Sequence, residues 1–380
     1  MWAKYKLSEL GAIVGGATPS TSVEKYYGGE IAWVTPKDLS SFSGRYIECG
    51  ERNITEEGLN SCSAQLLPAG SVLFSSRAPI GYVAIAKNPI ATNQGFKSLV
   101  PDTKKVDSLF MYYLLKYNKN RIEAMGSGTT FKEVSGATMK NIEVNLPPLA
   151  EQKRIAAILG ALDDKIELNR RINANLEEQV QALFKSWFVD FEPFRDSPFV
   201  DSELGKIPQG WKVGTFQDII SITSGKRPPL KIDKCTAEAY IPVYGAASIQ
   251  AYTTSFLRNE DLLLIGRVGT LGIVQKVTGL SWPSDNTLII TSPFYEYSYQ
   301  ILKAIDFNNF NRGSTQPLIT QADIKNQTLL LPPNEVLYQY EKIAINMFSL
   351  NKKNNAEFKT LSALRDTLLP KLMAGEIAIE

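Results

Sequence analysis

The side chains that most often perform chemistry in enzymes are scarce in this sequence. No histidine occurs among its 380 residues, so neither a Ser-His-Asp triad, a Cys-His pair nor a His-ligated zinc site can form. The three cysteines, Cys49, Cys62 and Cys235, lack metal-binding spacing and are expected to be free thiols in a reducing cytoplasm. Phosphate-loop and dinucleotide-binding glycine motifs are also missing. These features disfavour catalysis, without excluding it, and predict no catalytic residue and no metal.

Contact with nucleic acid is the chemistry that the remaining polar residues favour. The stretches "SSRAPIG" and "IGRVGTLG" place Arg77 and Arg267 where an apolar run meets a turn. An arginine at such a junction can bind a guanine edge or a phosphate, or it can pair with a buried acid. Glycine turns with Ser and Thr let backbone amides approach phosphates, although ordinary turns have the same composition. The candidate DNA-binding residues are Thr18, Ser20, Lys25, Arg77, Asn93, Gln94, Lys97, Thr129, Thr130, Lys132, Lys226, Arg227, Lys231, Arg267, Asn286, Arg312, Thr315 and Gln316.

Net charge adds little to that hypothesis. The chain has 41 basic and 39 acidic residues, and the positive excess of its globular segments is slight. A DNA-binding protein can have such totals when its charge is segregated, so the balance neither supports nor excludes binding.

The candidate residues lie in two similar halves of the chain. "GSGTTFKEVSGATMKNIEVNLPP" (126–148) aligns with "NRGSTQPLITQADIKNQTLLLPP" (311–333), and "YKLSELGAIV" near the start resembles "WKVGTFQDII" from Trp211. "VLFSSRAPIGYVAIA" also resembles "LLLIGRVGTLGIVQK", which aligns Arg77 with Arg267. An ordered series of matches predicts a tandem duplication of one unit, a globule followed by a helix.

Each globule is predicted to be a mixture of strands and helix. Short β-like runs such as "EIAWVTP", "GSVLFSS", "GYVAIA", "DLLLIG" and "NTLIIT" are separated by Gly, Pro and Asn. One helix is expected in each globule, at 107–118 and at 295–306.

A long helix is predicted after each Leu-Pro-Pro. The first runs from Glu151 to about Phe188, the second from about Glu335 to Met373, and Pro370 is expected to break or kink the end of the second. Apolar residues recur at alternating steps of four and three, as in a coiled coil, over on the order of 55–60 Å. The helix seam comprises Ile155, Leu159, Leu162, Ile166, Asn169, Leu176, Val180, Leu183, Trp187, Met347, Asn354, Leu361 and Leu368.

Two alternatives concern these helices. Each stripe is either the face of a helix packed on its own globule or, as we prefer, the seam of an antiparallel helix pair. Asn169 and Asn354 either face each other and fix the register of that pair, or are two solvated side chains, with equal weight.

The predicted fold class is α/β, with mixed α+β globular domains, long antiparallel coiled-coil helices and a tandem pseudo-two-fold repeat. The expected division is a first globular domain at 1–148, a central long helix at 149–190 and a linker at 191–210. A second globular domain at 211–333 and a distal long helix at 334–380 follow. No apolar run reaches the ~18 residues of a membrane span, so no membrane contact is expected.

Taken together, these motifs resemble the specificity (S) subunit of type I restriction–modification enzymes. The residues that carry the resemblance are Leu-Pro-Pro-x-x-Glu-Gln-x-x-Ile (146–155) and its continuation "LGALDDKIELNRRINANLEEQVQALFKSWF". "YKLSELGAIVGGATPS", "SSRAPIGYVAI", "ATNQGF" and the ending "LRDTLLPKLMAGEI" also resemble that family. The second helix departs from the pattern, because it has "PNEVLYQYEK" where the first has Glu-Gln.

The resemblance implies a cytoplasmic, non-catalytic subunit that reads a bipartite target in double-stranded DNA, one half with each recognition domain. It further implies that the helices bind two methyltransferase (M) subunits, that restriction (R) subunits join this core, and that S-adenosylmethionine is held by the M subunits rather than by this chain. The alternatives from the residues alone are a stand-alone bipartite DNA-binding protein or a coiled-coil interaction scaffold.

Overall fold

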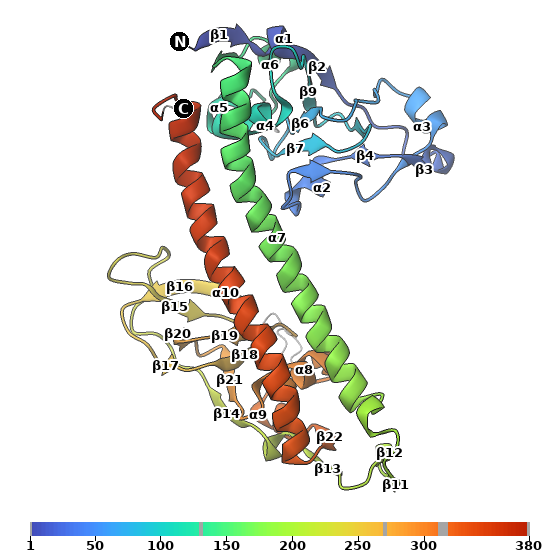
Figure 1. Cartoon of the computed structure of the whole chain (residues 1–380), viewed down its shortest axis with the longest axis vertical. Helices are drawn as coiled ribbons and strands as arrows, with labels where there is room; N and C mark the ends of the chain where they lie inside the picture. The colour runs from blue at the N-terminus through green and yellow to red at the C-terminus, as the bar shows by residue number, and fades with distance from the viewer. Residues whose placement is uncertain (1, 129–131, 269–271, 311–317, 378–380) are drawn as a thin grey trace. The chain divides into compact units, whose positions relative to one another are not determined.

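The computed structural model describes residues 2–128, 132–268, 272–310 and 318–377 of the chain. It divides into two compact units (Figure 1): unit 1 comprises Met1–Arg170 and Asn355–Glu380, and unit 2 comprises Arg171–Asn354. Each unit therefore contains one globule and a part of both long helices, α7 (Leu149–Phe188) and α10 (Asn334–Met373).

The globule of unit 1 is built on a five-stranded sheet in the order β2-β9-β6-β7-β5, with the pairs β4-β8 and β1-β10 beside it. Its strands are β1 (Ala3–Lys6), β2 (Gly11–Gly15), β3 (Tyr27–Ile31), β4 (Trp33–Val34), β5 (Tyr46–Ile47), β6 (Val72–Phe74), β7 (Val83–Ala86), β8 (Ala91–Thr92), β9 (Lys97–Pro101) and β10 (Glu143–Leu146). Its helical segments are α1 (Leu7–Leu10), η1 (Glu24–Tyr26), α2 (Pro36–Ser40), α3 (Glu56–Asn60), α4 (Ser108–Tyr117), α5 (Lys119–Ala124) and α6 (Gly136–Lys140).

The largest core of unit 1 is shared between this globule and both long helices. Phe110 and Tyr113 of α4 are fully buried beside Ile155 and Leu159 of α7, and Leu372 of α10 belongs to the same cluster. Burial of apolar surface is the main favourable term in folding, so the helices hold the globule by the same force that forms its interior.

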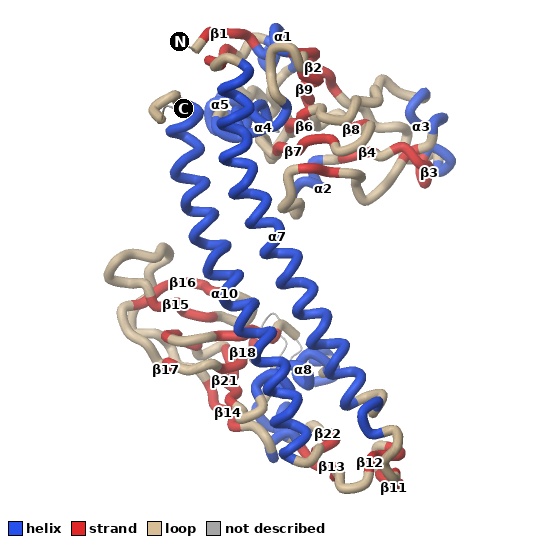
Figure 2. The backbone as a smooth tube through the Cα atoms, viewed as in Figure 1, coloured by secondary structure: helices blue, strands red, loops and turns tan. Residues whose placement is uncertain are grey.

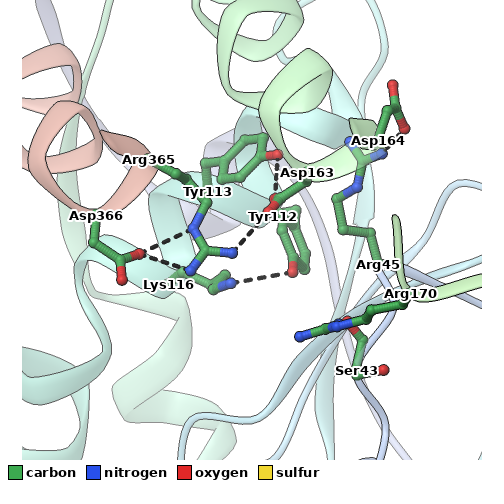
Figure 3. Close-up of polar contacts among 10 residues, drawn as sticks. All are labelled: Ser43, Arg45, Tyr112, Tyr113, Lys116, Asp163, Asp164, Arg170, Arg365 and Asp366. Atoms are coloured by element: carbon green, nitrogen blue, oxygen red, sulfur yellow. Dashed lines mark hydrogen bonds and ion pairs between the residues drawn. The ribbon is translucent and has the colours of Figure 1, made fainter. Parts of the chain in front are cut away.

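A buried polar network joins the same three helices (Figure 3). The hydroxyl of Tyr113 donates to Asp163 Oδ2 at 2.7 Å, and Arg365 NH1 binds Asp163 Oδ1 at 2.7 Å. Burial, together with the charge of Asp163, raises the pKa of Tyr113, so its hydroxyl stays protonated and can donate. Arg365 also binds Asp366, its neighbour on α10, at 2.8 Å. Asp163 thus connects α4 to α7 and α7 to α10.

The globule of unit 2 contains two four-stranded sheets, β14-β21-β18-β19 and β16-β15-β20-β17, and the pairs β13-β22 and β11-β12. Its strands are β11 (Phe199–Ser202), β12 (Gly205–Pro208), β13 (Lys212–Thr215), β14 (Ser221–Ser224), β15 (Ile241–Tyr244), β16 (Ile249–Thr253), β17 (Arg258–Asn259), β18 (Leu262–Gly266), β19 (Val274–Val277), β20 (Leu280–Pro283), β21 (Thr287–Thr291) and β22 (Thr328–Leu331). Its helical segments are η2 (Glu192–Phe194), η3 (Phe216–Asp218), α8 (Tyr295–Ala304), η4 (Phe307–Phe310) and α9 (Gln321–Lys325).

Aromatic residues of the segment between α7 and β13 pack against the core of unit 2. Phe191 and Phe194 lie edge-on to Trp211, with ring centroids 5.3 and 5.2 Å apart. Phe188 at the end of α7 contacts Tyr340 of α10, with centroids 5.0 Å apart. Aromatic pairs in this geometry add to the energy of burial, so Phe191 and Phe194, within the stretch expected to be a linker, pack against the core of unit 2.

Two buried carboxylates attach α8 to the rest of unit 2. The backbone amides of Glu296 and Tyr297 donate to Glu341 of α10 at 3.2 and 2.7 Å. Lys276 Nζ on β19 binds both oxygens of Glu296, at 2.9 and 2.6 Å, and lies 4.1 Å from the ring centroid of Tyr299. Burial raises the pKa of Glu341 to about 7, although the hydrogen bonds that its carboxylate accepts from the two backbone amides lower that pKa.

The two long helices run antiparallel within each unit. Figure 2 shows them as continuous helices, and each is 40 residues long. In unit 1, Asp163 meets Arg365 while Arg170 lies over the ring of Phe358 at 4.8 Å, so rising numbers in α7 match falling numbers in α10. In unit 2, Asn173 likewise meets Asn354, and Phe188 meets Tyr340.

The predicted seam residues all lie at least partly buried in the structure. Asn169 and Asn354 are 1% and 7% exposed, so the alternative of two solvated side chains is wrong. The other alternative, in which these two residues face each other, is not what the structure has, because Asn169 donates to Glu357 and Asn354 donates to Asn173, both at 2.9 Å. The stagger of the antiparallel helices brings each asparagine opposite a different residue from the one expected.

Most of the predicted elements are confirmed. The expected helices at 107–118 and 295–306 correspond to α4 and α8, and each quoted β-like run contains a strand. Pro370 does not break α10, which continues to Met373. Proline removes one helical hydrogen bond, and in the last turn that loss is small enough for the helix to continue.

Replacing the buried carboxylate of unit 1 is expected to destabilise the protein. Asp163→Ala leaves the guanidinium of Arg365 and the hydroxyl of Tyr113 without their acceptor, which should cost about 2–4 kcal/mol in the free energy of unfolding. The matched control is Asp366→Ala, which removes the other carboxylate on Arg365. Its side chain is 65% exposed, against 8% for Asp163, so its loss should cost less than about 1 kcal/mol. Urea titrations measure both, and equal losses would contradict the assigned role of Asp163.

Stability should depend on the ionisation of Glu341. A carboxyl whose pKa is raised in the folded state adds stability that is complete below its unfolded pKa and is lost as the pH rises through about 7. Glu341→Gln keeps an acceptor but cannot ionise, so the Tm of the variant relative to wild type should rise from about pH 5 to about pH 8. Glu335→Gln, an exposed change on the same helix, is the control and should leave the profile unchanged. A constant Tm difference for Glu341→Gln would refute this role.

Candidate nucleic-acid interface

The loop after β2 in unit 1 approaches the loop after β8 very closely. The amide of Ala17 donates to the carbonyl of Thr92 at 3.0 Å, and a Cβ on Gly16 would lie 2.2 Å from that oxygen. Only glycine fits so short a backbone approach. The two loops are therefore fixed side by side, and they carry the candidates Thr18, Asn93 and Gln94.

Polar contacts within and between the two loops involve these three residues. The hydroxyl of Thr18 donates to the side-chain oxygen of Gln94, and Asn93 Oδ1 accepts from the amide of Gly95 at 2.9 Å. The amide of Ser76 donates to the carbonyl of Gly95 at 2.7 Å, which brings the turn after β6 next to this loop. The sequence-predicted residues of both loops are thus grouped with Arg77 in one region of unit 1.

Arg77 lies in an ion-pair cluster with Glu133 and Lys97. Its Nε donates to Glu133 Oε2 at 2.8 Å, and Lys97 Nζ is 3.4 Å from Glu133 Oε1. Partial burial acts to raise the pKa of Glu133, but the hydrogen bond and charge of Arg77, with the charge of Lys97, lower it overall. The carboxylate stays ionised, and the cluster of two cations and one anion keeps one positive charge.

The other described candidates of unit 1 are less closely grouped. Lys25 is exposed and forms an ion pair with Glu57 of α3. Ser20 shares a hydrogen bond with Ser22 at 2.8 Å. Lys132 is exposed, and its carbonyl accepts from the amide of Ala78 at 3.3 Å, which places it beside the turn of Arg77.

The corresponding loop of unit 2 carries exposed cations. A Cβ on Gly225 would lie 2.1 Å from the carbonyl oxygen of Ser284, the same close approach as at Gly16. Lys226, Arg227 and Lys231 follow this glycine, are exposed, and have no ion pair or side-chain hydrogen bond among the described residues. Unpaired cations on a loop fixed by a tight backbone contact suit a phosphate backbone.

Arg267 lies differently from Arg77. Its amide donates to the carbonyl of Asn286 at 2.9 Å, and its carbonyl accepts from Ile319 at 2.9 Å. Its Nε is buried and has no hydrogen-bond partner within the described part of the chain. The candidate Asn286 is exposed next to it.

The sequence alignment of Arg77 with Arg267 is wrong by one residue. Arg77 forms a β-bridge with Glu133, whereas in unit 2 the equivalent bridge joins Val268 to Leu318. The preceding residues agree with this register. The carbonyl of Ser76 accepts a hydrogen bond from the amide of Val134, and the carbonyl of Arg267 accepts one from the amide of Ile319, so Ser76 corresponds to Arg267. Side chains alternate between faces along a strand, so a shift of one residue reverses the side on which they lie.

Some predicted residues cannot be located. Thr129, Thr130, Arg312, Thr315 and Gln316 lie outside the described residues. Sequence reasoning missed Glu133, which binds two of the predicted cations, although it lies inside the quoted motif "GSGTTFKE". The sequence offered one indication of its role, because Glu133 aligns with Leu318 in the two repeats. An acid and a leucine at matched positions imply that the two side chains have different surroundings in the two globules.

The described residues form neither a metal centre nor a membrane span. The described residues contain no group of three or more His, Cys, Asp or Glu side chains able to hold a metal ion. Within the same parts of the chain, no helix is long and apolar enough to cross a bilayer.

Comparison with known proteins finds the same duplication. The family model for the type I restriction modification DNA specificity domain matches residues 1–178 and again residues 208–364. A crystal structure of the type I restriction-modification S subunit from M. genitalium has a TM-score of 0.64 and 17% identity, covering 98% of this chain and 96% of that one. That similarity confirms the mixed α/β fold with long helices.

Two curated relatives extend over nearly the whole chain. The type I restriction enzyme MjaIX specificity subunit of Methanocaldococcus jannaschii is 36% identical, over 100% of this chain and 94% of the relative. The HindI specificity subunit of Haemophilus influenzae is 23% identical, over 99% of each chain. With two specificity domains matched in tandem and a full-length relative at this identity, the chain belongs to the family of type I restriction enzyme specificity subunits.

Proposed function

We propose that this specificity subunit reads a bipartite target in double-stranded DNA, one half with the globule of each unit. In the proposal the helix pair sets the gap between the halves and holds two methyltransferase subunits, which restriction subunits join in the cytoplasm. S-adenosylmethionine would be bound by the methyltransferase subunits, and this chain would contribute recognition and no catalytic step.

The observation that carries the proposal is that the loops after Gly16 and Gly225 are held by similar hydrogen bonds in the two units but carry different side chains. The bond from the amide after the tight glycine recurs, at 3.0 Å from Ala17 to Thr92 and at 3.1 Å from Lys226 to Pro283. A tryptophan Nε1 then donates to the carbonyl of Ala17 in unit 1, and another donates to that of Lys226 in unit 2. A fixed frame with variable loop side chains suits two readers that dock alike and read different bases.

The helices supply separate surfaces for protein partners. In unit 1, Ile158, Leu168 and Leu364 are exposed apolar residues of α7 and α10. In unit 2 the exposed apolar residues of α10 include Tyr338, Ile345 and Leu350. Exposed apolar residues of this size are frequent at protein interfaces, and their presence in each unit is consistent with one methyltransferase per unit.

The decisive experiment expresses the chain with the methyltransferase from the same genome and maps methylated adenines in the host DNA. The proposal predicts a motif with two specified parts separated by an unspecified gap. DNA binding without any directed methylation would favour a stand-alone DNA-binding protein. Absence of both DNA binding and methylation would favour an interaction scaffold.

Lengthening the helix pair should lengthen the gap. Insertion of one heptad in α7 after Asn173 and one in α10 after Asn351 keeps the seam in phase, since these residues face each other. Seven residues add ~10 Å, which corresponds to about three base pairs at ~3.4 Å each. Sequencing of the methylated motif should show a longer gap and the same two half-sites. The control has the heptad in α7 alone, which shifts the seam and should reduce stability. An unchanged gap in the double insertion would contradict the spacer role.

A further inference from the structure

Arg77 and Glu133 are held opposite each other by backbone pairing. Glu133 exchanges two backbone hydrogen bonds with Ser127, both at 2.9 Å, and forms a β-bridge with Arg77. The next residue, Val134, donates its amide hydrogen to the carbonyl of Ser76, the residue before Arg77, at 2.8 Å. Directly paired residues of antiparallel strands project to the same face, so the ion pair follows from the register of the backbone.

The ion pair leaves the binding end of the guanidinium unoccupied. Only Nε of Arg77 binds Glu133, and the terminal nitrogens form no hydrogen bond with any described residue. The side chain is 46% exposed, whereas Lys97 on the other oxygen of Glu133 is 17% exposed. Lys97 therefore fixes the carboxylate from inside the unit, and the carboxylate fixes Arg77 at the surface.

We infer that Arg77 reads a guanine in one half-site and that Glu133 is the positioning residue that orients it. Two parallel N–H donors match O6 and N7 of guanine in the major groove, and no other base offers two acceptors there. A guanidinium already held at Nε loses less side-chain entropy on binding than a free one. This inference rests on the proposed DNA-reading function, and it adds that Arg77 is the residue that reads a base and that the base is a guanine.

The duplicated unit supports this assignment. At the equivalent bridge of unit 2, both members differ together, since Val268 replaces Arg77 and Leu318 replaces Glu133. The backbone frame is kept, yet this pair cannot make a charged hydrogen bond. An ion pair needed to hold the fold would leave the second unit deficient, whereas a base reader is expected to differ between two half-sites.

The test uses the purified complex of the full chain with its methyltransferase. Exchange of residues 1–148 for those of a relative first identifies the half-site that this segment reads. Methylation rates are then measured on duplexes in which each base pair of that half-site is replaced in turn. For wild type, one G·C pair should be preferred by about 5- to 150-fold over its replacements. A half-site made only of A·T pairs would overturn the inference.

Variants separate base reading from other roles. Arg77→Lys keeps the charge but not the two-pronged donor, so it should abolish discrimination at that one pair and keep most of the affinity. Glu133→Gln should weaken discrimination at the same pair with an unchanged Tm. The control Glu48→Gln removes the carboxylate of an exposed pair with Lys87 in the same unit and should change neither.

Two further results would overturn the assignment. Uniform weakening on all duplexes in Arg77→Met, with a salt slope reduced by about one unit, would make Arg77 a phosphate contact. Wild-type discrimination in both Arg77→Lys and Glu133→Gln, with a lowered Tm, would make the pair structural. If the wild-type complex methylates no motif at all, the proposed function itself fails and this inference with it.

Discussion

A buried carboxylate must find donors for its oxygens, and in each unit one such carboxylate attaches the globule to the long helices. In unit 1, Asp163 of α7 accepts from Tyr113 of α4 and binds Arg365 of α10. In unit 2, Glu341 of α10 accepts the two backbone amides at the start of α8. The apolar contacts around them tolerate small displacements, but these bonds require one geometry. The orientation of each globule's helix on its part of the helix pair therefore depends on a few polar atoms.

Sequence periodicity predicted the helices well because the apolar seam depends on residues close together in the chain. The steps of four and three placed Ile155, Leu159 and Val180 on the buried face, where the structure has them. The partners across the seam could not be predicted, because they depend on the stagger between two helices distant in sequence. Asn354 therefore meets Asn173 and not Asn169, although Asn169 and Asn354 were both assigned to the seam.

The candidate site illustrates the same limit at the level of single residues. The close backbone contacts of Gly16 and Gly225 recur in the two units, because such a contact tolerates only glycine. Arg77 and Arg267 were wrongly paired, because "SSR" and "IGR" look alike while the β-bridges set a register one residue apart. Glu133 was missed because its significance arises only when a strand pairing brings it opposite Arg77.

Local pairing also explains why the net charge of the chain predicted so little about recognition. Many cations are neutralised by nearby acids, as in the exposed pairs Lys37–Glu51 and Lys87–Glu48. Such pairs contribute little stability and hardly attract a distant anion. The cations that have no such partner among the described residues include Lys226, Arg227 and Lys231 on one loop of unit 2, and the Arg77 cluster of unit 1 keeps one excess positive charge. A near-neutral total can therefore coexist with positive charge at the loops, because some acids of the globules are already bound to other cations, as Glu51 and Glu48 are.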